Sequence, residues 1–163
     1  MLSYHGNQEI LKERKVGFLS SRNLPSYSAD RTGKWIAEQK DKNECVVIGH
    51  HSDVEKKAFR QLINGRSRII LVLSKPLRGS LREDVKRSVS EGRLLIVYPS
   101  YSKVSDYFHF SAELRNKLII FLSDDLFIAH ARRGGILEKI ISGIQEKLIF
   151  YKTPSEKMLL HAR

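Results

Sequence analysis

Four short polar segments of this chain combine hydroxyl groups, glycines and cations, which are the groups that bind phosphate in proteins. The segments are Ser20–Asn23, Gly49–Asp53, Tyr98–Lys103 and Arg132–Gly135. Glycine lets an anion reach backbone N–H groups, helix N-termini attract negative charge, and Arg or Lys supplies the counter-charge. The formal net charge of +11 favours nucleic acid, nucleotide phosphates or acidic proteins as partners. These segments therefore indicate anion binding.

Several of these residues have plainer alternative roles. Ser52 or Asp53 can cap a following helix, and Gly134–Gly135 can form only a tight turn into the last helix. The adjacent His50 and His51 would need further ligands to hold a metal, and no carboxylate or histidine at suitable spacing supplies them. The sequence has neither a GxGxxG nor a Walker A motif, so we expect no dinucleotide site, no NTPase site and no cofactor.

The apolar runs of the chain are short and continuous, which is typical of strands buried on both faces of a parallel sheet. We expect strands at Val16–Ser20, Cys45–Gly49, Arg68–Leu73, Leu94–Tyr98 and Leu126–Ala131, with Leu148–Lys152 as a sixth candidate. Amphipathic segments alternate with them, at Ala29–Asp41, Val54–Asn64, Leu81–Glu91, Ser111–Leu122 and Ile136–Leu148. This alternation predicts an α/β fold with a doubly wound, mostly parallel sheet of about five to seven strands and helices on both faces. The polar segments then share the rim at the carboxyl ends of the strands, where open α/β sheets bind ligands.

The length of 163 residues and the 41% apolar fraction predict a single domain over residues 1–163. Residues 1–14 are expected to form an N-terminal extension or short helix, and residues 153–163 a C-terminal tail. No run reaches the ~18 apolar residues of a membrane span and the N-terminus lacks an apolar signal core, so we expect a cytoplasmic protein without a membrane partner. Cys45, the single cysteine, is expected to be a core residue rather than part of a disulfide or zinc site. An exposed edge strand or the apolar residues Met158–Leu160 would support a homodimer.

Four strings of the sequence together resemble the DNA-processing protein A (DprA/Smf) family. They are SSRN after the first strand, VVIGHHSDVEKKAF after the second, GRLLIVYPSY at the fourth and RNKLIIFLSDD before the fifth. The RN-x-L-I-x-x-L-S-D string is the most specific part, and the resemblance covers Lys15 to Pro154. It implies a Rossmann-like domain that binds single-stranded DNA in a basic pocket and often self-associates. Ser21-Arg22, Gly49 and Arg115-Asn116 match residues of the family's motifs.

The chain departs from the family in two loops. Asp53-Val54-Glu55 stands where the family has a Gly-Ile-Asp string, and Arg133-Gly134-Gly135-Ile136 replaces a Ser-Gly-Ser loop after the fifth strand. The related LOG phosphoribohydrolases have a PGGxGTxxE string there, of which this chain keeps Gly134-Gly135 and Glu138 but not the Gly-Thr pair. A LOG-type enzyme acting on nucleoside monophosphates is therefore an alternative, and a nucleotide-sensing domain without catalysis is another.

Our prediction is a DprA-like module that binds single-stranded DNA or nucleotide phosphates on the basic rim. Exposed aromatic residues around the fourth loop (Tyr98, Tyr101, Tyr107, Phe108 and Phe110) would stack on bases. We assign no catalytic residue and no metal ligand. The predicted phosphate or nucleic-acid contacts are Ser21, Arg22, Gly49, His50, Ser52, Arg115, Asn116, Arg132, Arg133, Gly134 and Gly135.

Overall fold

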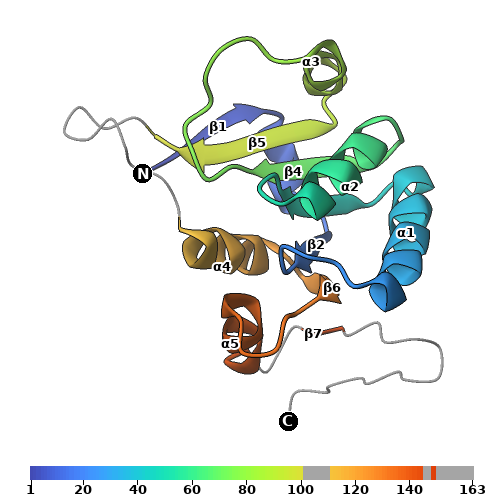
Figure 1. The fold of residues 1–163 in the computed structure, drawn as a ribbon. Helices are drawn as coiled ribbons and strands as arrows, with labels where there is room; N and C mark the ends of the chain where they lie inside the picture. Colours follow the sequence, from blue (N-terminus) through green and yellow to red (C-terminus); the bar gives the residue numbers. More distant parts are fainter. Residues whose placement is uncertain (101–110, 145–147, 150–163) are drawn as a thin grey trace.

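One twisted sheet runs through the protein, with helices packed on both of its faces (Figure 1). The computed structural model describes residues 1–100, 111–144 and 148–149. Within them the sheet has seven strands in the order β1-β5-β4-β3-β2-β6-β7, and all neighbours are parallel except β1 and β5. The strands are β1 (Leu2–Gly6), β2 (Lys15–Ser20), β3 (Cys45–Gly49), β4 (Arg68–Val72), β5 (Leu94–Pro99), β6 (Asp125–His130) and β7 (Leu148–Ile149). The predicted doubly wound α/β fold is confirmed.

The two faces of the sheet have separate hydrophobic cores, because successive side chains of a strand point to opposite faces. In β3, Val46 and Ile48 belong to the core beneath α1 (Ser26–Asp41), α2 (Asp53–Ile63) and α3 (Glu83–Ser90). Cys45 and Val47 belong to the other core, beneath the 3-10 helix η1 (Gln8–Lys12), α4 (Ala112–Leu122) and α5 (Ile136–Ser142). Burial raises the pKa of the Cys45 thiol to about 12, which agrees with its predicted place in the core.

The N-terminal segment is part of the fold: residues 2–6 form a sheet strand where an extension was expected, and the expected short helix is the 3-10 helix η1 at Gln8–Lys12. Residues of β1 pair with β5 in antiparallel register, from Leu2 opposite Pro99 to Gly6 opposite Leu95. Ile10 in η1 is fully buried against the core. The segment therefore extends and covers the sheet.

Some predicted ends differ from the structure. The helix expected over 136–148 ends at Ser142, where the backbone N–H of Gly143 bonds the carbonyl of Ile140. The strand expected over 148–152 is described only as Leu148–Ile149. Four of the predicted stacking residues (101, 107, 108 and 110) and the tail 153–163 lie outside the described residues. Among the described helices, none is long and apolar enough to cross a membrane.

The strand order reverses between β2 and β6. From β2 the chain adds β3, β4 and β5 on one side, and then crosses to place β6 on the other side of β2. Such a switch point leaves a crevice at the carboxyl ends of the two strands, because the loops that follow them turn toward opposite faces. The loops concerned begin at Ser21 and at Ala131.

Candidate functional site

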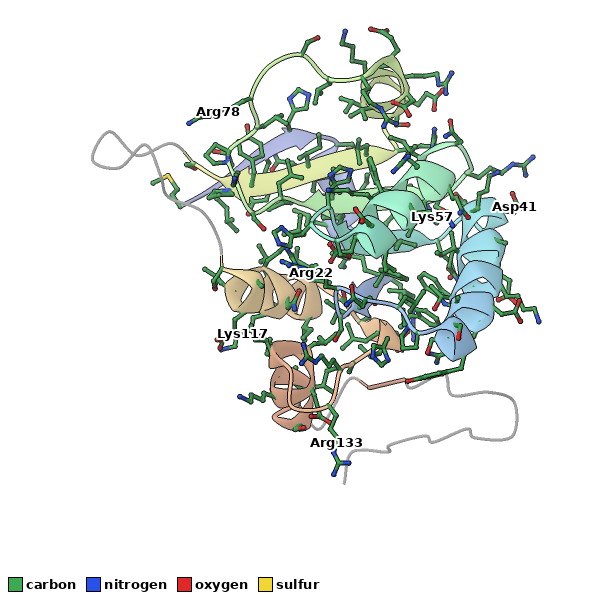
Figure 2. All side chains as sticks on the ribbon, viewed as in Figure 1. Arg22, Asp41, Lys57, Arg78, Lys117 and Arg133 are labelled. Atoms are coloured by element: carbon green, nitrogen blue, oxygen red, sulfur yellow. The ribbon has the colours of Figure 1, made fainter. Side chains whose placement is uncertain are left out.

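A cleft of about 700 Å³ lies at this switch point. The loop after β2, the β3–α2 loop, α4, the end of β6 and the start of α5 all contribute to its walls. The structure places Arg22 centrally among these elements (Figure 2). Seven of the predicted contact residues line the cleft, namely Ser21, Arg22, Ser52, Arg115, Asn116, Arg132 and Gly135.

The other four predicted contacts are not among the lining residues, and each has a different setting. Gly49 is buried behind the cleft, and His50 lies edge-on against the ring of Phe59, with 5.4 Å between ring centroids. Arg133 and Gly134 are exposed, and the Arg133 side chain extends away from Arg22 (Figure 2). The cleft is also lined by His51, which lies in the predicted Gly49–Asp53 segment but was not a predicted contact, and by Leu24, Pro25, Ala112, His130, Ile136 and Leu137.

Ser21 ties the two loops of the switch point together. Its backbone N–H donates to the carbonyl oxygen of His130 at 2.7 Å, and its hydroxyl oxygen accepts from the backbone N–H of Arg132 at 2.7 Å. Arg22 is the residue after Ser21 in the first loop, and Arg132 lies in the second. Because the two loops are bonded to each other, both exposed arginines line the same cleft. The fixed loops reduce the entropy cost of bringing two cations to one anionic ligand.

The β3–α2 loop already contains a carboxylate at the position where an anion would bind. The backbone N–H groups of His51 and Ser52 donate to Glu55 Oε2 at 2.7 and 2.9 Å. The Ser52 hydroxyl in turn accepts from the backbone N–H of Glu55 at 3.2 Å, which completes a capping box at the start of α2. Because these donors are occupied, the geometry favours the capping alternative for Ser52 over a direct phosphate contact.

Arg115 forms the floor of the cleft as part of a buried ion pair. Its side chain and that of Glu55 are 6% and 1% exposed, with 3.6 Å between Arg115 Nη2 and Glu55 Oε1. Arg115 also donates to Ser74 Oγ at 3.4 Å and to Asn116 Oδ1 at 3.3 Å. A Cβ on Gly49 would stand 2.9 Å from Glu55 Oε1, so glycine makes room for the pair. Arg115 thus positions the loop that bears His51 and Ser52.

The cations of the cleft affect the histidine beside them. The pKa of His51 is lowered from 6.5, first by partial burial and then by the charge of Arg115, with a smaller contribution from Arg22. Glu55 acts in the opposite direction but does not reverse the shift. The imidazole is therefore mainly neutral at neutral pH, and the cleft keeps a positive field that favours an anion.

The glycine loop before α5 has the geometry of a turn. Gly134 has a φ of +71°, and the backbone N–H of Gly135 bonds the carbonyl of Arg132 at 2.9 Å. Glu138 folds back so that its Oε2 accepts from the backbone N–H of Gly134 at 2.5 Å, and it is not among the residues that line the cleft. Within the described parts of the chain, no group of three or more His, Cys, Asp or Glu side chains could hold a metal ion.

The strand order and the cleft define a Rossmann-like α/β domain with an open, basic site at its switch point. The family model for DNA recombination-mediator protein A matches residues 1–157, and the chain therefore belongs to this family. No curated protein sequence matches the chain.

Two solved structures share the fold. One is DNA processing protein A from Helicobacter pylori, described for its single-stranded DNA binding mode. It has 19% sequence identity and a TM-score of 0.67, and the match covers 96% of this chain and 74% of that one. The other is DNA processing protein A from Streptococcus pneumoniae, with 21% identity and a TM-score of 0.65 over 91% of this chain and 54% of that one. At these identities the likeness establishes the fold, and this chain spans only part of either relative.

Proposed function

We propose that this protein binds single-stranded DNA in the switch-point cleft, with phosphates held by Arg22 and Arg132. The observation that carries the proposal is the pair of exposed arginines on two loops that Ser21 joins, at the position where open α/β sheets bind ligands. The net charge of +11 and the family membership support it, as does the fold shared with the H. pylori protein.

The rest of the cleft suits a nucleotide chain better than an isolated anion. Its walls combine the two cations with apolar side chains from Leu24, Ala112 and Ile136. Single strands expose base faces that can lie on such surfaces, whereas a duplex keeps its bases stacked on each other. We therefore expect a preference for single strands over duplexes of the same sequence. The homodimer and the cytoplasmic location implied by the resemblance and the sequence remain predictions.

Equilibrium binding of a labelled oligonucleotide, followed by fluorescence anisotropy, tests the proposal. Arg22→Ala and Arg132→Ala should each weaken binding about ten-fold, the loss of one charge-assisted contact. Arg66→Ala is the matched control, because Arg66 is exposed and precedes β4 at the opposite ends of the strands. Equal affinities for all three variants and the unmodified protein, or no binding at all, would contradict the proposal.

The phosphoribohydrolase alternative is less well supported by the geometry. In that reading Glu138 would act on the substrate, but its carboxylate bonds the backbone N–H of Gly134 and is not among the residues lining the cleft. Incubation with nucleoside monophosphates, with Glu138→Gln as control, is the direct check. Release of free base by the unmodified protein and not by the variant would support the phosphoribohydrolase hypothesis.

A further inference from the structure

The first turn of α1 carries an aromatic ring that the hydrophobic core does not use. Tyr27 is 74% exposed, whereas Phe18, Trp35 and Phe127 stack on one another inside the protein with centroid distances between 4.3 and 5.9 Å. Exposing a large ring forgoes the free energy of burying it. A role at the surface would explain why an aromatic residue stands there.

The neighbours of Tyr27 fix it at the mouth of the cleft. Its ring meets that of His130, a lining residue, at 80° with 6.2 Å between centroids, so the two rings are not stacked face to face. Pro25, which also lines the cleft, immediately precedes α1 as its N-cap. Arg31, one turn further along, points inward and donates to the carbonyl of Ala129 at 2.6 Å. Tyr27 is thus set on a rigid helix beside the cleft.

The cleft and its mouth hold the two kinds of group that one nucleotide needs. Arg22 and Arg132 supply positive charge in the same cleft, and Ile136 is a lining residue whose side chain remains 52% exposed. A nucleotide needs cations for its phosphate and an aromatic or apolar surface for its base. We infer that Tyr27 is a base-stacking residue of this site, with one base of a single strand on its ring and the adjoining phosphates at the arginines. This inference rests on the proposed function.

The stacking role predicts that binding depends on bases and not only on phosphates. The test compares a labelled single-stranded oligonucleotide with an abasic one of the same length, which has the same phosphates and no bases. Tyr27→Ala should bind the base-containing strand about ten-fold more weakly and the abasic strand as the unmodified protein does. Its salt dependence should not change, because no charge is removed. Tyr27→Phe should retain normal binding, since it keeps the ring.

The outcomes separate this inference from the proposed function. Tyr4→Ala, at a 42% exposed tyrosine of the edge strand β1, is the matched control and should have no effect. If the unmodified protein binds both strands and Tyr27→Ala binds each strand with the same affinity as the unmodified protein, the stacking role is wrong, and the proposal of a DNA-binding cleft is unaffected. Loss of binding in Tyr27→Phe as well would assign the effect to the hydroxyl and overturn the inference. If the unmodified protein binds neither strand, the proposed function fails and the inference fails with it.

Discussion

Replacing Glu55 by glutamine removes one charge from the buried pair beneath the cleft while it keeps the side-chain volume. The carboxylate is 1% exposed and accepts from the N–H groups of His51 and Ser52 while it faces Arg115 at 3.6 Å. Both N–H groups donate to the same carboxylate oxygen, Oε2, so the amide oxygen of glutamine can accept both bonds, while its NH₂ group replaces Oε1 and faces the Arg115 guanidinium. The guanidinium of Arg115 is then left buried without a counter-charge.

The expected cost of Glu55→Gln is about 3 kcal/mol of unfolding free energy. Breaking a buried pair by removing one partner costs about 3–5 kcal/mol. The long contacts of Arg115, 3.3 to 3.6 Å, place this pair near the lower end of that range. Since domains of this kind are stable by only about 5–15 kcal/mol, the loss is large and readily measured.

Urea denaturation followed by circular dichroism measures the change. Glu113→Gln is the matched control, because Glu113 forms an exposed, solvent-screened pair with Lys117 at 2.6 Å and its loss should leave the unfolding free energy nearly unchanged. Adding Arg115→Met to Glu55→Gln should recover part of the loss, since it removes the unpaired buried cation. A cost for Glu55→Gln below about 1 kcal/mol, similar to an exposed pair, would refute the reasoning that this pair closes the β3–α2 loop.

Two further predictions concern Gly49 and His51, which lie beside this pair. Gly49→Ala should lower the unfolding free energy by about 1–3 kcal/mol, because the new Cβ would stand 2.9 Å from a buried carboxylate oxygen. Gly33→Ala, where a Cβ meets nothing within 4 Å in helix α1, should instead raise it by about 0.5–1 kcal/mol, and chemical denaturation of both variants checks the opposite signs. The pKa of His51 is lowered from 6.5, and a bound phosphate would raise it again, so the DNA complex takes up a proton. Affinity should therefore increase as the pH falls toward and below about 6.5, and His51→Asn should flatten this dependence; a pH-independent affinity in the unmodified protein would contradict it.

The buried strands could be predicted from the sequence because each is a continuous apolar run. Strands β2 to β6 begin and end within one residue of the predicted runs. The edge strand β1 could not be predicted from an apolar run. Its five residues, LSYHG, are partly or fully exposed, and its pairing with β5 depends on residues more than 80 positions away. A short, half-exposed antiparallel strand at a sheet edge has too weak a hydrophobic pattern for the sequence to distinguish it from an N-terminal extension.

The rim of the site could be predicted, whereas the roles of its residues could not. Carboxyl ends of parallel strands meet at one edge, so the approach of Ser21 to Arg132 follows from the strand pattern. The burial of Arg115 depends on how α4 packs on the sheet, which brings the guanidinium beside Glu55 at the start of α2, and no local pattern gives this. The spacing Ser52-x-x-Glu55 is typical of a capping box. This pattern in the sequence would have predicted that the Glu55 carboxylate bonds the N–H groups of the loop. The exposure of Tyr27 depends in the same way on how α1 packs.

The salt dependence of single-stranded DNA affinity tests the central claim most directly. If the cleft binds the phosphate backbone, the logarithm of the affinity should fall with the logarithm of salt concentration by about 0.7 for each phosphate neutralised. Arg22→Ala should make this slope shallower by about 0.7, and Arg66→Ala should leave it unchanged. A salt-independent affinity, or the same change of slope in both variants, would contradict binding at the switch-point cleft.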